Sequence, residues 1–239
     1  MFARVAIFVY GLGCCAILAG TFLYAIGFTG NLVVPKSMDS APEGSVAEAL
    51  VIDIALLSLI GLQHSLMARE WFKSFFIRVV PKAAERSTCV LSSSLMLLLL
   101  FWQWRPIGGV IWDPESPSVS AVVYTLFAYG WVTVLVSTFL IDHFDFFGLR
   151  QAYLYLRLRE YAPVVFKTRG PWRYVCHTHH VGWLLVFWSA STMTLAHLVF
   201  AMAASGYILM QSTSKSATSS NSMARQTSAI EREYRCLYL

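Results

Sequence analysis

The stretch VSAVVYTLFAYGWVTVLVSTFLI, residues 119–141, decides the fold because it contains no charged side chain. A helix needs about 20 apolar residues to cross the hydrocarbon core of a bilayer, so this run is long enough for one span. Comparable apolar runs occupy residues 4–27, 46–66 and 87–104. The 239-residue chain is 57% hydrophobic and 13% charged, whereas a soluble domain is about 25% charged. The sequence therefore predicts an all-α, polytopic membrane protein.

A fifth apolar run, residues 181–210, is too long for one ordinary span and is interrupted by SASTMT at residues 189–194. We expect it to form two shorter helices in a hairpin, which gives a bundle of five to six transmembrane helices. Arg4 and the pair Gly13-Cys14 raise the alternative that the first run is a cleaved signal peptide. Its length and the lack of an A-x-A-like exit favour a retained span.

Lysine and arginine are distributed unevenly between the loops. Residues 67–86 and 142–180 hold eleven basic residues, and the intervening loops hold only Lys36 and Arg105. Cytoplasmic loops carry the excess of basic residues, so both basic loops and the amino terminus are expected in the cytoplasm. This asymmetry and attraction to the lipid bilayer account for the net charge of +5, and no nucleic-acid partner is implied.

The 142–180 segment carries most of the reactive side chains, including four of the six histidines: His143, His177, His179 and His180. Ionisable groups beside membrane spans are costly unless they face protein or water, so this cluster is a candidate functional site. The pattern H-x-H-H leaves open a metal site completed by Asp142 or Asp145. Membrane di-iron oxygenases need more histidines at other spacings, so a polar cap of the fifth span is the favoured interpretation of His179 and His180.

His64 and Asp53 are ionisable residues inside the second apolar run. His64 ends that run beside Gln63, and a single histidine there is more often hydrogen-bonded to a neighbouring helix than catalytic. Asp53 lies deeper in the run. A carboxylate in that position needs a partner or a proton.

Several stretches of the chain resemble one family of membrane enzymes. NLVVPKSMDS (31–40), LIGLQHSLMAREWFK (59–73), STFLIDHFDFFGLRQ (137–151) and the stretches at 85–112 and 182–201 look like the bacterial methanethiol S-methyltransferases. That group is similar to the isoprenylcysteine carboxyl methyltransferases and to membrane proteins associated with denitrification. The resemblance covers about residues 1–210. It implies methyl transfer from S-adenosylmethionine to methanethiol, giving dimethyl sulfide, at a cytoplasm-facing site in the bacterial inner membrane.

The wider family's cofactor motif reads G-L-Y-R-x-V-R-H-P, followed four positions later by G. The chain matches it at Gly170, Arg173, Val175, His177 and Gly182, but Cys176 and Thr178 replace the usual Arg and Pro. The missing arginine would suit the methionyl carboxylate, because it is a bidentate donor with a fixed charge. The resemblance implies that Arg173, Tyr174, His177 and Gly182 hold S-adenosylmethionine, without a metal ion.

An alkyl thiol is mostly protonated at neutral pH, so the reaction benefits from a base. We expect His143 or Asp142 to be that base, with Arg150 and Gln151 shaping the entrance. Two other functions remain open. One is a non-catalytic or degenerate membrane accessory of nitrogen-oxide respiration, and the other is a metal-dependent membrane oxidoreductase.

Residues 211–239 are expected to form a cytosolic tail after a single membrane domain, residues 1–210. Residues 211–229 are rich in Ser and Thr, which predicts disorder. The family signature E-E-R-x-L is missing after Leu209. Codons for residues 210–224 can be chosen so that a second reading frame encodes E-E-R-D-L, which suggests the hypothesis of a frameshift.

Overall fold

The computed structural model describes residues 1–42, 44–67, 69–141, 143–161 and 172–222, and helices make up most of this part of the chain. The helices are α1 (Phe2–Gly30), α2 (Val46–Met67), α3 (Glu70–Phe76), α4 (Glu85–Gln103), α5 (Pro117–Ile141), α6 (His143–Phe146), α7 (Leu149–Leu156), α8 (Trp172–Trp188) and α9 (Leu195–Ser222). Strands β1 (Val110–Trp112) and β2 (Met193–Thr194) pair antiparallel. This short sheet is the one element type that the sequence did not predict.

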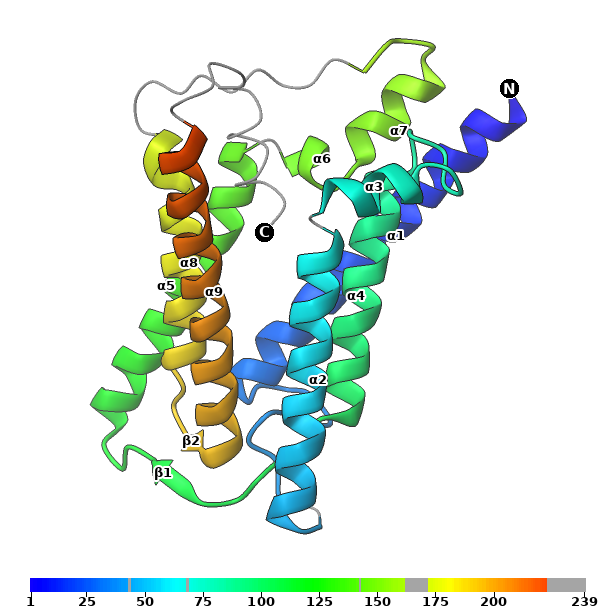
Figure 1. Cartoon of the computed structure of the whole chain (residues 1–239). Coiled ribbons are helices and arrows are strands. Elements are labelled where there is room, and N and C mark those ends of the chain that lie inside the picture. Colours follow the sequence, from blue (N-terminus) through cyan, green and yellow to red (C-terminus); the bar gives the residue numbers. More distant parts are fainter. Residues whose placement is uncertain (43, 68, 142, 162–171, 223–239) are drawn as a thin grey trace.

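The long helices confirm the predicted membrane bundle. Phe2–Gly30, Val46–Met67 and Pro117–Leu140 are long and apolar enough to cross a bilayer, and Leu195–Met210 is a shorter apolar helix. The interrupted fifth run forms the expected hairpin, because α8 ends at Trp188 and α9 begins at Leu195 (Figure 1). Together with α4, these helices form an all-α, multi-pass membrane protein.

Two boundaries differ from the expectation. Helix α8 begins at Trp172 rather than after residue 180, so part of the predicted loop is helical. Helix α9 continues to Ser222, twelve residues into the segment predicted to be disordered. Neither extension contains glycine or proline, the residues that interrupt a helix most strongly, so each extension can continue the helix beside it. Composition alone underestimated both helices.

The helices form two groups, which Figure 1 shows side by side. Helices α5, α8 and α9 pack together, and α1 packs against α4 and α7 with α2 on α4. We call the end of the bundle with α3, α6 and α7 the α6 end, and the opposite end, with the two strands, the β end. One apolar cluster joins the groups around Phe28, Trp104 and Ala196, and another around Trp131 and Val186.

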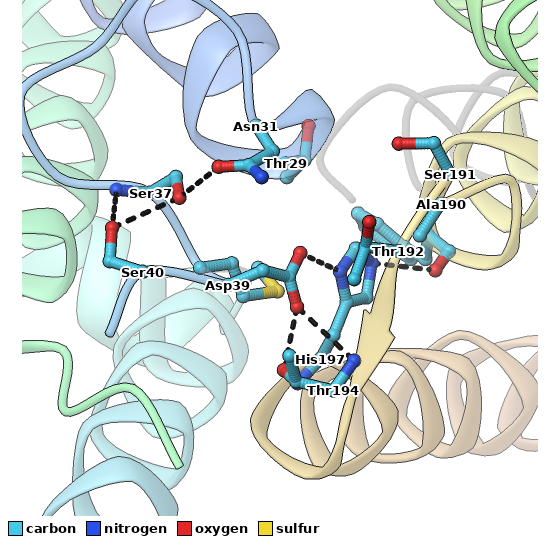
Figure 2. Close-up of polar contacts among 12 residues, drawn as sticks. Thr29, Asn31, Ser37, Asp39, Ser40, Ala190, Ser191, Thr192, Thr194 and His197 are labelled. Carbon is cyan, nitrogen blue, oxygen red and sulfur yellow. Dashed lines mark hydrogen bonds and ion pairs between the residues drawn. The ribbon is translucent and has the colours of Figure 1, made fainter. Parts of the chain in front are cut away.

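A buried polar pair fastens the two groups at the β end (Figure 2). The Asp39 Oδ2 atom is 2.8 Å from His197 Nδ1, and these side chains are 1% and 0% exposed. Thr194 donates to Asp39 Oδ1 through both its backbone N–H and its hydroxyl. His197 Nε2 lies 3.1 Å from the Phe187 carbonyl oxygen, and because a carbonyl only accepts, Nε2 carries a proton. His197 therefore has a structural role.

Asp53 also finds its partners near the β end. Its Oδ1 atom accepts a 2.9 Å hydrogen bond from the backbone N–H of Arg105. The positive charges of Lys36 and Arg105 lie close enough to interact with the carboxylate. Lys36 also donates to the Trp102 carbonyl oxygen at the end of α4. The two basic residues of the intervening loops thus accompany this buried acid.

Candidate functional site

The contact between α5 and α8 sets the geometry of the candidate site. The two helices are antiparallel neighbours, with Gly182 against Gly130 and His179 hydrogen-bonded to Ser137. This register places the first turn of α8 beside the last turn of α5. Helix α6 follows α5 directly, so the segments that carry the predicted cofactor residues and the predicted base meet at the α6 end.

Gly182 lies where the two backbones approach most closely. A Cβ atom at this position would be 2.9 Å from Val134 Cγ2 and 3.1 Å from the Gly130 carbonyl oxygen. Glycine at both positions lets membrane helices pack at short range. Gly182 therefore positions α8 against α5. Its contact with the cofactor stays a prediction.

The other predicted residues are placed only by their elements. Arg173, Tyr174 and His177 belong to the first turns of α8, and His143 begins α6. Their side chains, and the whole of Asp142, lie outside the described residues. The structure thus brings their helices to one end of the bundle and leaves their individual contacts as predictions.

Both ring nitrogens of His179 have hydrogen-bond partners within the protein. Its Nε2 atom accepts from the Trp183 indole N–H at 3.0 Å, so Nδ1 carries the proton and faces the Ser137 hydroxyl at 2.6 Å. Ser137 in turn donates to the Val134 carbonyl oxygen. His179 therefore links α8 to α5 and has no free nitrogen for a metal ion. This inter-helix role replaces the polar cap expected from the sequence.

A charged cluster at the α6 end is centred on Asp145 of α6. Arg86 Nη1, from the first turn of α4, lies 2.6 Å from Asp145 Oδ2 and 2.9 Å from its carbonyl oxygen. The Tyr161 hydroxyl donates to the same Oδ2 at 3.1 Å. The Arg86 and Asp145 side chains are 11% and 7% exposed. Buried ion pairs of this kind fix the relative position of the elements that carry them, here α4, α6 and the segment after α7.

Arg150 supplies a second positive charge to the same carboxylate. Its Nη1 atom is 3.7 Å from Asp145 Oδ1, beyond hydrogen-bond distance, and its guanidinium lies 5.9 Å from the Tyr161 ring centre. Nη1 is buried and has no hydrogen-bond partner in the described part of the chain. The neighbouring Gln151 is 9% exposed, and its Oε1 atom is likewise without a partner there. Both residues were expected at the entrance, and both retain hydrogen-bonding capacity.

A glycine allows α7 to approach α4 within this cluster. Gly148 has a positive φ of 79°, which glycine adopts without strain. A Cβ atom there would lie 2.7 Å from Arg86 Cβ and 2.7 Å from the Ser87 backbone nitrogen. The role of Arg86 was missed in the sequence because it lies 59 residues from Asp145 and no local motif connects the two.

Polar side chains near the carboxyl end of α2 also lie at the α6 end. Gln63 Nε2 is 3.2 Å from the Ser92 hydroxyl of α4. The Ser65 hydroxyl is 3.3 Å from the Tyr207 hydroxyl of α9. His64, between them, has a buried Nδ1 atom that no described residue hydrogen-bonds. Among the described residues, none is the helix partner that the sequence led us to expect for His64.

Comparisons with known proteins identify close relatives. A protein named methanethiol S-methyltransferase from Crocosphaera subtropica is 52% identical over 208 residues, which are 87% of this chain and 82% of that protein. One of the same name from Mycobacterium tuberculosis is 44% identical over 202 residues, 84% of this chain and 83% of that protein. Nurim from Bos taurus is 30% identical over 174 residues, 69% of this chain and 65% of that protein.

No family model and no solved structure matches the chain. The family assignment therefore rests on the sequence relatives. Two of them carry the same name and align over more than four fifths of this chain and of their own length. The chain belongs to the methanethiol S-methyltransferase family.

Proposed function

We propose that this protein transfers a methyl group from S-adenosylmethionine to methanethiol and releases dimethyl sulfide. The observation that carries the proposal is the 52% identity over 208 residues with the Crocosphaera subtropica protein of that name. A degenerate accessory protein and a metal-dependent oxidoreductase are not favoured, because the relatives that align over most of the chain are named methanethiol S-methyltransferase. Both ring nitrogens of His179 are hydrogen-bonded to protein atoms and are not free to bind a metal ion, which also argues against the oxidoreductase.

The described residues at the α6 end fit a zwitterionic methyl donor. When bound, S-adenosylmethionine supplies an electrophilic methyl group on a sulfonium. Its methionyl carboxylate needs a cationic donor, and Arg150 has a buried N–H without a described hydrogen-bond partner. Arg150 would thus compensate for Cys176, which stands where the family motif has arginine. Arg173, Tyr174 and His177 are proposed to hold the rest of the donor, with Gly182 setting the position of their helix.

The thiol requires a proton acceptor, for which His143 and Asp142 are the candidates from the sequence. We propose that methanethiol, which is small and apolar, enters through the lipid bilayer, and that the charged donor enters from the cytoplasm. The site would then lie at the cytoplasmic face of the bacterial inner membrane, as the excess of basic residues at the α6 end suggests. A closed site that excludes water favours in-line methyl transfer.

The carboxyl-terminal segment departs from the family pattern. Residues 211–239 stand where the family has E-E-R-x-L, and our hypothesis is that a frameshift replaced it. Nucleotide sequence whose codons do not encode E-E-R-D-L in a second frame would exclude this hypothesis. If the codons do encode it, a version with the frame restored tests whether the change lowers donor affinity.

The decisive experiment is to express the chain in a bacterium without this activity, supply methanethiol and measure dimethyl sulfide in the headspace. Production above the empty-vector level supports the proposal, and no product from well-inserted protein contradicts it. Arg173→Ala and His177→Ala should each weaken binding of S-adenosylmethionine by the purified protein. His197→Gln serves as a matched control for the loss of a histidine, because His197 lies at the β end, and it should leave donor binding unchanged.

A further inference from the structure

Helix α2 presents one buried stripe to the rest of the bundle. Successive residues of a helix are turned by about 100°, so positions three, four, seven and eleven apart lie on the same face. Ala49 and Asp53 are buried, and Leu57 and Ile60 pack against the cluster around Trp104. His64 continues this stripe, eleven residues after Asp53. The imidazole is therefore on the interior face of α2, at its α6 end.

The lipid-facing side of α2 lies on the opposite face. Leu59, Leu62 and Leu66 are 43%, 64% and 36% exposed. Leu62 is two residues before His64 and so points about 200° away from it. A lipid-facing position for the imidazole is thus excluded by the pattern of exposure, and His64 is directed into the protein.

His64 lacks the hydrogen bonds that a structural histidine normally makes. Nδ1 is buried and has no partner among the described residues. A buried polar atom without a partner costs about 1–3 kcal/mol, so the position of Nδ1 calls for an explanation. His197 and His179 provide the contrast within the same chain, because both ring nitrogens of each are within hydrogen-bond distance of protein atoms. When Nε2 carries the proton, Nδ1 of His64 is an acceptor that no described residue uses.

Side chains of α4 and α9 flank His64 on either side of α2. Gly61 and Ser65, on either side of His64 along the helix, both lie against Tyr207 of α9. On the side of α2 that faces α4, Gln63 lies close to Ser92 and Met67. The titratable groups that the adjoining helices bring to this end are Tyr207 of α9, Glu85, Arg86 and Cys89 of α4, and Glu70 and Lys73 of α3.

We propose that His64 is the catalytic residue that takes the proton of the thiol. This inference rests on the proposed function. The thiol S–H gives its proton to Nδ1 of the neutral imidazole, and the sulfur lone pair forms the new bond to the methyl carbon. The electron pair of the broken sulfonium–carbon bond stays on the donor's sulfur, which becomes a neutral thioether. The imidazolium then releases its proton to the cytosol, and no oxidant or metal is needed.

This assignment moves the base from α6 to α2 and to the interior face of the bundle. His143 and Asp142, the candidates from the sequence, then contribute to the cytosolic side of the site. The two assignments make opposite predictions for His64 and His143 variants, so one comparison decides between them.

The test compares His64→Ala and His64→Gln with His143→Gln and with Leu62→Ala, a lipid-facing neighbour, as the control. Wild-type protein must produce dimethyl sulfide, and its failure to do so would count against the proposed function rather than against His64. For both His64 variants we expect kcat at neutral pH to fall by about 10²–10⁴-fold, the usual contribution of a general base. Binding of S-adenosylmethionine, measured by calorimetry, should stay at the wild-type level.

Two further measurements separate a base from a structural residue. With a base missing, turnover should rise by about tenfold per pH unit until the thiol itself ionises. The deficit should also shrink for a more acidic thiol, such as an aromatic one, which needs less help to lose its proton. His64→Gln is included because it retains a polar side chain if His64→Ala does not fold.

Three results would overturn the inference. The first is turnover within about threefold of wild type in His64→Gln. The second is an equal deficit at every pH and for both thiols, which indicates a structural role. The third is a loss in His143→Gln that shows the pH and thiol dependence predicted here for His64.

Discussion

Replacing Asp145 by alanine removes the carboxylate at the centre of the charged cluster on α6. The wild-type side chain is 7% exposed, accepts hydrogen bonds from Arg86 and Tyr161, and lies 3.7 Å from Arg150. Two guanidinium groups therefore lose the anion that they share. We expect this variant to be the least stable of the cluster, because the positive charges that remain are partly buried and repel each other.

The magnitudes follow from burial. Breaking a buried ion pair by removing one partner costs about 3–5 kcal/mol, which is our expectation for Asp145→Ala. Arg86→Ala leaves the carboxylate with Tyr161 and Arg150, so a loss of about 2 kcal/mol is expected, the value of one charged hydrogen bond. The Arg150 side chain is 33% exposed and too distant for a hydrogen bond, so Arg150→Ala should cost about 0–1 kcal/mol.

The assay is reversible unfolding in mixed micelles of increasing SDS content, for the three single variants and the Arg86→Ala/Asp145→Ala double variant. The double-mutant cycle should give a coupling energy well above the approximately 0.5 kcal/mol seen between independent sites. An Arg86→Ala variant that is as unstable as Asp145→Ala would refute the argument from shared charge. Additivity of the two substitutions would refute the direct interaction itself.

Three other predictions test the remaining parts of the structure. Gly182→Leu should destabilise the protein by about 1–3 kcal/mol in thermal unfolding, because its Cβ would lie 2.9 Å from Val134 Cγ2, and an unchanged Tm would contradict the close packing. Asp39→Asn should cost about 1–3 kcal/mol and leave the affinity for S-adenosylmethionine unchanged, whereas a parallel loss of affinity would show that the β end contributes to the site. Prolonged treatment with a chelator should leave methyl transfer intact, and activity restored by added iron would contradict the absence of a metal from the mechanism.

The membrane bundle was predictable because apolar length is a strong signal. The hairpin at residues 189–194 followed from the interruption of a run too long for one helix, and it is confirmed by the positions of α8 and α9. The start of α8 was not predictable in the same way. Residues 172–180 are polar enough to resemble a loop, but they continue the helix of the span that follows.

The partners of buried polar residues were not predictable from the sequence. His197 and Asp39 are 158 residues apart, and Arg86 and Asp145 are 59 apart, so only the folded chain brings them together. The sequence showed that Asp53 requires a partner, and Arg105 is that partner through its backbone N–H rather than its charge alone. The predicted cofactor residues came instead from a local motif, which needs no tertiary information to be recognised.

The distribution of satisfied polar groups along the bundle argues for chemistry at the α6 end. At the β end, hydrogen bonds join Asp39 to Thr194 and to His197, which suits a structural link between the two helix groups. At the α6 end, buried atoms of His64, Arg150 and Gln151 lack partners within the described residues, although Asp53 Oδ2 near the β end and Trp131 Nε1 in an apolar cluster do as well. Asp53 lies in the field of two positive charges, which stabilises it without a ligand. No described residue gives His64 such compensation, and a substrate is the partner that we propose for Nδ1.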